Sequence, residues 1–260
     1  MDEPPCHLNR DNLNAFYEAD LARYGPDDAR SLHWVSSRTQ RTRFEVLYDV
    51  GPWDSVSVAD VGSGLGDFVG FLVSKGHSVK PGPGPARLTA EIAENAEKMN
   101  NSANSPSSAV NPGRQGVVWY NGYDINPAMV QAARKKYPQG SFHTRDILTE
   151  GFAGPADYVI ASGTFNIRIE DHDHWFRECL AAMYANCRRA VAFNFLGLPP
   201  DFSKYGQRSP ANGNLLQQWH NLYYEVDPDE VKEYCQTLSG NVSMRGGYLP
   251  GDHTVFIHRP

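Results

Sequence analysis

The stretch from Val58 to Asp67 narrows the choice of folds more than any other part of the sequence. It reads Val-Ala-Asp-Val-Gly-Ser-Gly-Leu-Gly-Asp, and an apolar segment with helical spacing follows it. This order predicts a strand, a tight turn and a helix. Glycine lets such a turn adopt positive φ and leaves room for a ligand against bare backbone, while the helix start offers unpaired N–H groups. We therefore expect a nucleotide-like ligand at this turn.

The spacing of the glycines separates two ligand classes. A dinucleotide-binding turn has the pattern G-x-G-x-x-G, with an acid about 20 residues further on. Here Gly66 follows Gly64 by two residues, and Asp67 stands where the dinucleotide pattern has its third glycine. The pattern is instead Asp60-x-Gly-x-Gly-x-Gly. A tight turn without a ligand is the alternative interpretation.

Length and composition limit the remaining possibilities. The 260 residues suffice for one α/β domain with a large core. A net charge of −6 argues against a broad nucleic-acid-binding surface. The four cysteines form no C-x-x-C pair, so neither a zinc knuckle nor a disulfide framework is expected, and a reduced, cytoplasmic setting fits. No window approaches about 18 apolar residues and the first ten residues lack an apolar core, so we expect neither a membrane span nor secretion.

The segments before and after the glycine turn differ in character. Residues 1–50 are expected to form an N-terminal helical cap, with helices over about 11–24 and 36–50, and residues 51–260 the main domain. Residues 80–116 are rich in Pro, Gly, Asn and Ser and predict an insertion. We expect disorder at the flanks of the insertion; a helix within it that closes over the site as a lid is the alternative.

Further acids stand at the ends of later predicted strands. The run 117–124 ends in Asp124, after which Asn126 and Pro127 are suited to opening a helix, and the run 141–147 carries Asp146. Ligands of an open parallel sheet lie outside the carboxyl ends of its strands, so we expect these carboxylates beside the glycine turn. Asp124 there can accept hydrogen bonds from both hydroxyls of a ribose, with a plain helix cap as the alternative.

The last part of the chain completes the sheet. The apolar run 156–161 predicts a central strand that is buried on both faces, a further strand is expected at 188–196, and the segments 242–248 and 253–258 are expected to pair antiparallel across a short turn. The predicted fold is α/β: a seven-stranded, mostly parallel, doubly wound sheet with a reversed C-terminal strand and helices on both faces.

This set of features resembles the class I S-adenosylmethionine (SAM)-dependent methyltransferases over almost the whole chain from about residue 34 to residue 258. The resemblance lies in Asp60-x-Gly-x-Gly-x-Gly, in Asp-Ile-Asn-Pro-x-Met from Asp124 onward, in Asp146 and in the terminal hairpin. It implies a Rossmann-like fold, SAM as the cofactor and S-adenosylhomocysteine (SAH) as the product. The insertion at residues 80–116 departs from the family pattern.

The resemblance also assigns cofactor-binding residues. Asp124 is assigned to the ribose, the Asp146 side chain and the Ile147 N–H to the adenine, and the end of the fourth strand to the reactive end of SAM. The basic and amide-bearing face of the second helix is either solvated or binds the methionine carboxylate, which needs a cation or an amide donor. The expected cofactor-binding residues are Trp34, Gln40, Arg43, Asp60, Gly62, Ser63, Gly64, Gly66, Asp124, Ile125, Asp146, Ile147, Ser162 and Gly163.

The implied chemistry is an in-line displacement on the methyl carbon, for which no metal is required. A base is needed only when the acceptor must lose a proton. Candidates for the base are His172, His174 and His220, with Tyr223 or Tyr224 as orienting hydroxyls, although a surface role is the alternative for any single histidine.

The fourth predicted strand is followed by Ser-Gly-Thr-Phe-Asn instead of an Asn/Asp-Pro-Pro-Tyr tetrad, which speaks against nucleic-acid amino-methylation. We expect no nucleic-acid or membrane partner and a small-molecule acceptor, with a peptide side chain as the alternative. A non-catalytic SAM-binding protein and an NAD-dependent oxidoreductase are the other two hypotheses.

Overall fold

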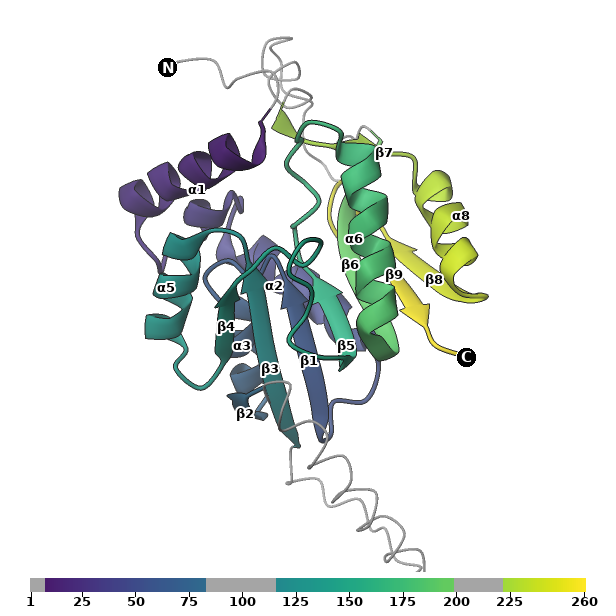
Figure 1. Ribbon diagram of the computed structural model, residues 1–260, viewed down its shortest axis with the longest axis horizontal. Helices are drawn as coiled ribbons and strands as arrows, with labels where there is room; N and C mark the ends of the chain where they lie inside the picture. The colour runs from purple at the N-terminus through teal and green to yellow at the C-terminus, as the bar shows by residue number, and fades with distance from the viewer. Residues whose placement is uncertain (1–7, 83–115, 199–221) are drawn as a thin grey trace, which may run out of the picture.

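The computed structural model describes residues 8–82, 116–198 and 222–260 (Figure 1). Within these ranges one nine-stranded sheet has the order β2-β3-β1-β5-β6-β9-β8, with β4 paired to β3 and β7 paired to β6. The strands are β1 Val56–Val61, β2 Ser78–Pro81, β3 Val117–Asp124, β4 Ser141–Thr144, β5 Ala156–Ala161, β6 Cys187–Gly197, β7 Glu225–Val226, β8 Asn241–Gly246 and β9 Asp252–His258.

Helices cover both faces of this sheet, as the sequence predicts (Figure 1). The helical elements are α1 Arg10–Tyr24, η1 Ala29–Leu32, α2 Ser37–Leu47, η2 Tyr48–Val50, α3 Asp67–Ser74, α5 Pro127–Lys136, α6 His172–Asn186 and α8 Pro228–Leu238. The paired strands run parallel except for β9, which is antiparallel to both β6 and β8. The predicted doubly wound α/β sheet with a reversed last strand is confirmed.

The strand count differs from the prediction, since the sheet has nine strands instead of seven. The two additional strands, β2 and β7, are short. Val79 is the one buried residue of β2, so this strand shows no apolar run in the sequence. It pairs with residues 117–120 of β3, while β4 pairs with residues 121–124, so the two short strands share one edge of β3.

Two cores hold the layers together. On the central strands, Val58 and Ile160 point into the core under α2, α3 and α5, whereas Ala59 and Val159 point into the core under α6 and α8. Both faces of β1 are therefore apolar and all six of its residues are buried. This explains why a nearly continuous apolar run, and not an alternating one, marks a central parallel strand.

Local capping fixes where the helices around the sheet begin. The Ser36 hydroxyl and Thr39 form a capping box at the start of α2. The Asn126 side chain accepts hydrogen bonds from the N–H groups of Ala128 and Met129, and Pro127 occupies the first turn of α5. These signals are local in sequence, which is why the helix starts are predictable.

The N-terminal elements relate to the sheet in two ways. Helix α2 belongs to the core, where Phe44 packs edge-on against Phe68 of α3. Helix α1 lies beyond the carboxyl ends of β1 and β3 (Figure 1), and the Asn14 carbonyl accepts a hydrogen bond from the Asn126 side chain. The division into a cap of residues 1–50 and a domain of residues 51–260 stays a prediction. Residues 83–115 of the expected insertion lie outside the described residues.

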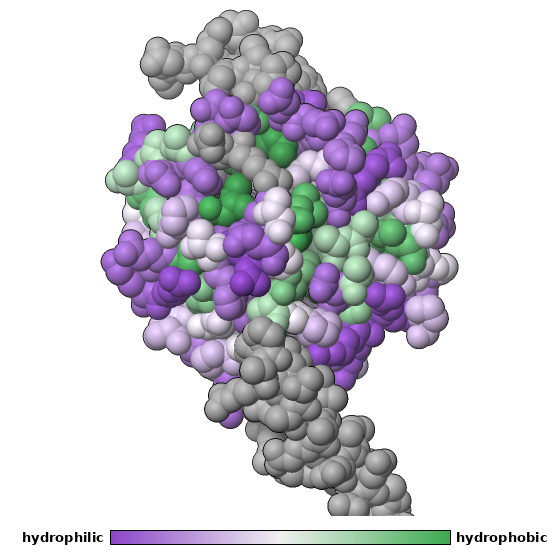
Figure 2. Space-filling view, in the orientation of Figure 1, coloured by the Kyte–Doolittle hydropathy of each residue, from purple (hydrophilic) through white to green (hydrophobic). Residues whose placement is uncertain are grey.

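The face seen in Figure 2 is mostly hydrophilic, and hydrophobic side chains reach it in small groups instead of one broad patch. Among the described residues, the exposed large hydrophobic side chains are Val35, Val73 and Leu198. No helix in the described ranges combines the length and the apolar character needed to cross a bilayer.

Candidate functional site

The glycine turn after β1 is held by the neighbouring strand. The N–H groups of Gly62 and Ser63 donate to the carbonyl of Tyr123, at 2.8 and 3.0 Å. Gly64 has a φ of 51°, and a Cβ added there would lie 2.9 Å from the Leu32 side chain. The turn thus needs glycine both for its backbone and for the close approach of η1.

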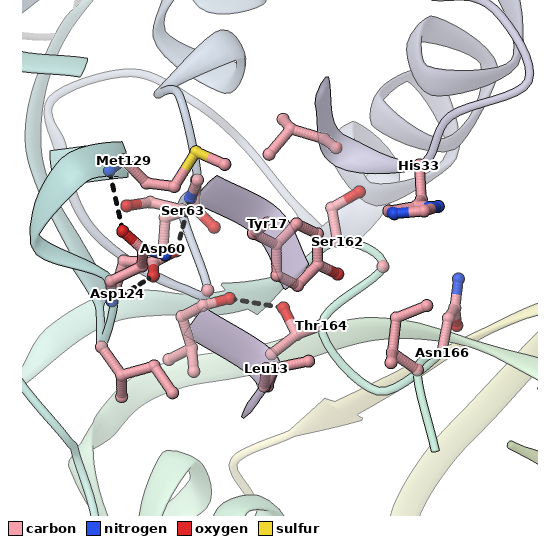
Figure 3. A pocket seen from close by; sticks show the side chains of 18 of the residues that line it. Leu13, Tyr17, His33, Asp60, Ser63, Asp124, Met129, Ser162, Thr164 and Asn166 are labelled. Atoms are coloured by element: carbon pink, nitrogen blue, oxygen red, sulfur yellow. Dashed lines mark hydrogen bonds between the residues drawn. The ribbon is translucent and has the colours of Figure 1, made fainter. Parts of the chain in front are cut away.

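Asp124, at the end of β3, is tied directly to this turn. Its Oδ2 accepts a 2.8 Å hydrogen bond from the Gly64 N–H, and its Oδ1 accepts one of 2.9 Å from the Asn126 N–H (Figure 3). Burial raises the pKa of the Asp124 carboxyl, and the two backbone donors act in the opposite direction. Asp124, at the end of β3, therefore lies directly against the glycine turn that follows β1.

Asp60 lies buried at the end of β1, where its Oδ2 accepts a 2.5 Å hydrogen bond from the Tyr120 hydroxyl. Burial raises the pKa of Asp60 to about 7, the Tyr120 hydrogen bond lowers it, and the negative charge of Asp124 raises it further. Figure 3 shows Asp60, Ser63 and Asp124 together on one side of a pocket. Two carboxyls with raised pKa values in one cleft are typical of a functional site.

One pocket joins the glycine turn to the strand ends and the N-terminal elements. Every expected cofactor-binding residue except Gly66 lines it. Gly66 instead begins α3, and a Cβ there would lie 2.6 Å from the Phe142 ring, so this glycine permits close packing of the helix on the sheet. The lining residues are Trp34, Gln40, Arg43, Asp60, Gly62, Ser63, Gly64, Asp124, Ile125, Asp146, Ile147, Ser162 and Gly163.

The polar side chains of α2 reach the pocket, but they already have protein partners. The Arg43 guanidinium forms a bidentate pair with Asp252, with both N–O distances at 2.6 Å, and lies 4.6 Å from the centre of the Trp34 ring. Gln40 donates a 3.0 Å hydrogen bond to Asp67. These contacts hold α2 and Trp34 against the rim of the site.

Four buried polar atoms of residues on the pocket wall lack a hydrogen-bond partner among the described residues. They are Ser63 Oγ, Trp34 Nε1, Asn166 Oδ1 and His33 Nε2. A buried polar atom without a partner costs about 1–3 kcal/mol, so such atoms indicate places where a ligand supplies the partner. Together with the paired strand-end carboxylates and the bare glycine backbone, they fit an elongated polar ligand such as SAM.

Of the residues expected to act as a base or to orient the acceptor, Tyr223 lines the pocket, whereas His172, His174 and Tyr224 do not. His172 is buried, its ring stacks on Tyr224 at 3.8 Å, and its Nδ1 accepts a hydrogen bond from the Ile169 N–H. Burial lowers the pKa of His172 to about 3. The Tyr224 hydroxyl donates to Asp173. Neither His172 nor Tyr224 is part of the pocket lining; both pack between α6 and the segment before β7.

His174 is exposed on the first turn of α6, where its Nε2 lies 3.3 Å from the Glu178 carboxylate, and it too lies off the pocket. His220 falls outside the described residues. The structure instead brings His33 and Tyr17 to the wall. Sequence reasoning missed both, because the approach of α1 and His33 to the strand ends depends on the tertiary fold, and no local motif signals it.

Comparison with known proteins agrees with this geometry. No protein-family model matches the chain. Over 145 residues, 54% of this chain and 78% of the relative, it is 35% identical to a Mycobacterium tuberculosis protein named "Putative methyltransferase Rv1506c".

Among solved structures, magnesium protoporphyrin IX methyltransferase from Synechocystis PCC 6803 with bound SAH has a TM-score of 0.56 at 15% identity, over 96% of this chain and 97% of that one. Human N-acetylserotonin methyltransferase in complex with SAM has a TM-score of 0.54 at 14% identity, over 95% of this chain and 58% of that one. The fold, the order of the motifs along the chain and the curated relative agree, and the chain belongs to the class I S-adenosylmethionine-dependent methyltransferases.

Proposed function

We propose that this pocket binds SAM and that the protein transfers its methyl group to a small-molecule acceptor. The observation that carries the proposal is the hydrogen bond from the Gly64 N–H to Asp124, at 2.8 Å. It places a carboxylate and a bare glycine backbone on one wall of a single pocket. A carboxylate with lone pairs to spare can accept hydrogen bonds from both hydroxyls of a ribose.

Each end of the pocket has a role in this proposal. Asp124 and Ile125 hold the ribose, the Asp146 carboxylate accepts from the adenine amino group, and the Ile147 N–H donates to an adenine ring nitrogen. The Leu148 N–H donates to Asp146 Oδ1 at 2.9 Å and fixes that carboxylate. At the other end, the unpartnered Trp34 Nε1 donates to the methionine carboxylate. Asp60, the glycine turn, Ser162, Gly163, Gln40 and Arg43 complete the enclosure.

When bound, SAM supplies a methyl group on a positively charged sulfur, which makes the methyl carbon electrophilic. The chain then has to hold an acceptor atom in line within about 3–3.5 Å and to keep water out. Leu13 and Tyr17 of α1 and Ile167 and Ile169 of the segment after β5 line the pocket with largely apolar surface. We propose that residues 1–50 serve as the cap of this chamber and residues 51–260 as the SAM-binding domain.

The placement of the chamber favours a small acceptor. It is lined by residues of α1 on one side and by the carboxyl ends of β1, β3 and β5 on the other, so we expect an acceptor to enter between these elements. A peptide side chain remains the second choice, because a long side chain can enter the same space.

Turnover tests the proposal. The protein is incubated with SAM that carries a labelled methyl group and with a panel of uncharged small molecules, and the labelled product and SAH are measured together. We expect both to form in equal amounts with at least one acceptor and to fall sharply in Asp124→Ala. SAM binding with no product from any acceptor would support the non-catalytic alternative, and NADH binding without SAM binding would support the oxidoreductase alternative.

A further inference from the structure

The two ends of the pocket differ in chemistry. Figure 3 shows the carboxyls of Asp60 and Asp124 on one side, and His33 and Asn166 on the other side, beyond Ser162. The proposed function assigns the first end and the wall at Trp34 to SAM. The second end is left for the acceptor, and its lining is one apolar cluster: Leu13, Tyr17, Ile167, Ile169 and Trp175.

The backbone and the ring of His33 are held in a single orientation at this second end. Its φ of 57° is in the left-handed region, where residues other than glycine are uncommon. Its N–H ends η1 by donating to the carbonyls of Ala29 and Arg30. Its ring stacks on Phe16 with centroids 4.2 Å apart and planes 7° from parallel. Such fixed, strained positions concentrate at functional sites.

Asp20 of α1 lies against the ring. Its Oδ2 is 2.6 Å from His33 Nε2, and the two side chains keep 19% and 22% of their surface exposed. The two atoms are close, but they do not form a hydrogen bond in this structure; catalytic hydrogen bonds often align only once the ligand is bound. A carboxylate beside Nε2 favours the tautomer with its hydrogen there, which leaves the lone pair on Nδ1.

Burial favours a neutral His33 ring more strongly than Asp20 favours a charged one. Burial lowers the pKa of His33, while the charge of Asp20 and its contact with the ring raise it. The other titratable group of α1 that faces the ring is Tyr17, whose ring lies edge-on at 5.8 Å. A histidine that is neutral at pH 7, with a carboxylate ready to stabilise its protonated form, is suited to accept a proton.

The same end of the pocket favours an uncharged, flat acceptor. Arg43 lines the pocket, but its charge is paired with that of Asp252, and Asp20 lies beside His33 without being part of the pocket lining. Tyr17 and Trp175 add aromatic faces. We propose that His33, positioned by Asp20, is the general base that takes the proton from the hydroxyl of an uncharged phenol-type acceptor. This inference rests on the proposed function.

In the proposed step the acceptor O–H bond breaks and its proton bonds to the Nδ1 lone pair of His33. An electron pair of the acceptor oxygen forms the new bond to the methyl carbon, and the electron pair of the old carbon–sulfur bond leaves with the sulfur, so that a neutral thioether remains. The imidazolium is stabilised by Asp20 and then loses its proton to water, which the partial exposure of both side chains allows.

A series of phenols tests whether His33 acts as the general base. The variant His33→Asn removes the base while keeping a residue that tolerates the left-handed backbone, and His174→Asn is the matched control on an exposed histidine. Rates with SAM are measured for phenol, 4-chlorophenol and 4-nitrophenol, which ionise progressively more easily. We expect His33→Asn to lower kcat/KM for phenol by about 10²–10⁴-fold, and to change it little for 4-nitrophenol, which ionises without help. His174→Asn should match the unaltered protein throughout.

Two readouts do not depend on turnover. Calorimetric titration with SAM should give the same affinity for the unaltered protein and for His33→Asn. NMR titration of the His33 ring should show a lower pKa in Asp20→Asn, because the carboxylate raises it. An equal loss for all three phenols, an unchanged His33 pKa in Asp20→Asn, or SAM binding without methylation of any phenol would overturn the inference. Failure of the unaltered protein to bind SAM would overturn the proposed function itself.

Discussion

At the scale of single residues, the carboxyls of Asp60 and Asp124 have different roles. Asp124 faces two backbone donors at the glycine turn, whereas Asp60 is buried behind the turn and shares a short hydrogen bond with Tyr120. A group with a raised pKa in the folded state holds a proton that the unfolded chain releases. Asp60 therefore links protein stability to pH, whereas Asp124 is the carboxylate that the proposed function assigns to the ligand.

The variant Asp60→Asn tests whether the protonation of Asp60 makes protein stability depend on pH. The pKa of Asp60 is raised from 3.8 to about 7, so its contribution to stability is full below pH 3.8 and is lost as the pH rises to about 7. The loss amounts to at most roughly 4 kcal/mol, at about 1.4 kcal/mol per pKa unit. Urea unfolding at pH 4, 5.5 and 7 should show the variant gaining stability relative to the unaltered protein as the pH rises. A constant difference across this range would contradict the assigned pKa.

The variant Asp124→Asn tests whether the Asp124 carboxylate binds SAM. The variant should bind SAM more weakly by about 1.5–3 kcal/mol, the range for a hydrogen bond to a charged group, which calorimetry resolves. Asp157→Asn is the matched control, because Asp157 also accepts a backbone hydrogen bond, from the Ser57 N–H at 2.8 Å, and is absent from the pocket lining. Equal SAM affinity in both variants would remove Asp124 from the site.

At the scale of elements, the segment before α2 meets the loop after β5 where Trp34 lies on Gly163. A Cβ at Gly163 would lie 2.6 Å from Trp34 Cη2, and the φ of Gly163 is 74°. The segment before α2 and the loop after β5 can come this close only because position 163 has no side chain. The approach closes one wall of the pocket.

Gly163→Ala should therefore push Trp34 away and weaken SAM binding, beyond the cost of backbone strain. Gly151→Ala is the matched control, since Gly151 has a similar φ of 67° but nothing within 4 Å of an added Cβ. Both variants should lose some thermal stability, and only Gly163→Ala should lose SAM affinity as well as change the Trp34 fluorescence. An unchanged affinity in Gly163→Ala would show that this contact does not shape the site.

Features that depend on residues close together in the sequence could be predicted, whereas features that depend on contacts between distant residues could not. The glycine turn, the helix caps and the apolar central strands have local signals, and their order along the chain gave the parallel sheet and the strand-end acids. Strand β2 was missed because Val79 alone is buried in it. His33 was missed because its partner Asp20 and its stacking on Phe16 arise only when the chain reverses between α1 and η1.

At the scale of the whole molecule, an ion pair joins helix α2 in the N-terminal part of the chain to the C-terminal hairpin. Arg43 of α2 and Asp252 of β9 are 209 residues apart in sequence, and their side chains are only 12% and 2% exposed. The pair fixes the terminal hairpin to the N-terminal region beside the pocket. Removal of one partner would leave a buried charge without compensation.

Asp252→Asn should lower the free energy of unfolding by about 3–5 kcal/mol, measured by urea denaturation. Asp49→Asn is the matched control, because the Asp49–Arg245 pair also has a 2.5 Å contact but is half exposed on both sides. That change should cost about 1 kcal/mol or less. Similar losses for the two variants would show that burial of the Arg43 pair does not set its contribution.

Calorimetric titration of the full chain with SAM, SAH and NADH in parallel tests whether the pocket between the glycine turn and the N-terminal helices binds SAM. We predict one site that binds SAM and SAH, is weakened in Asp124→Asn and does not bind NADH. Binding of NADH alone, or SAM binding that is unaffected by Asp124→Asn, would contradict the assignment of this pocket.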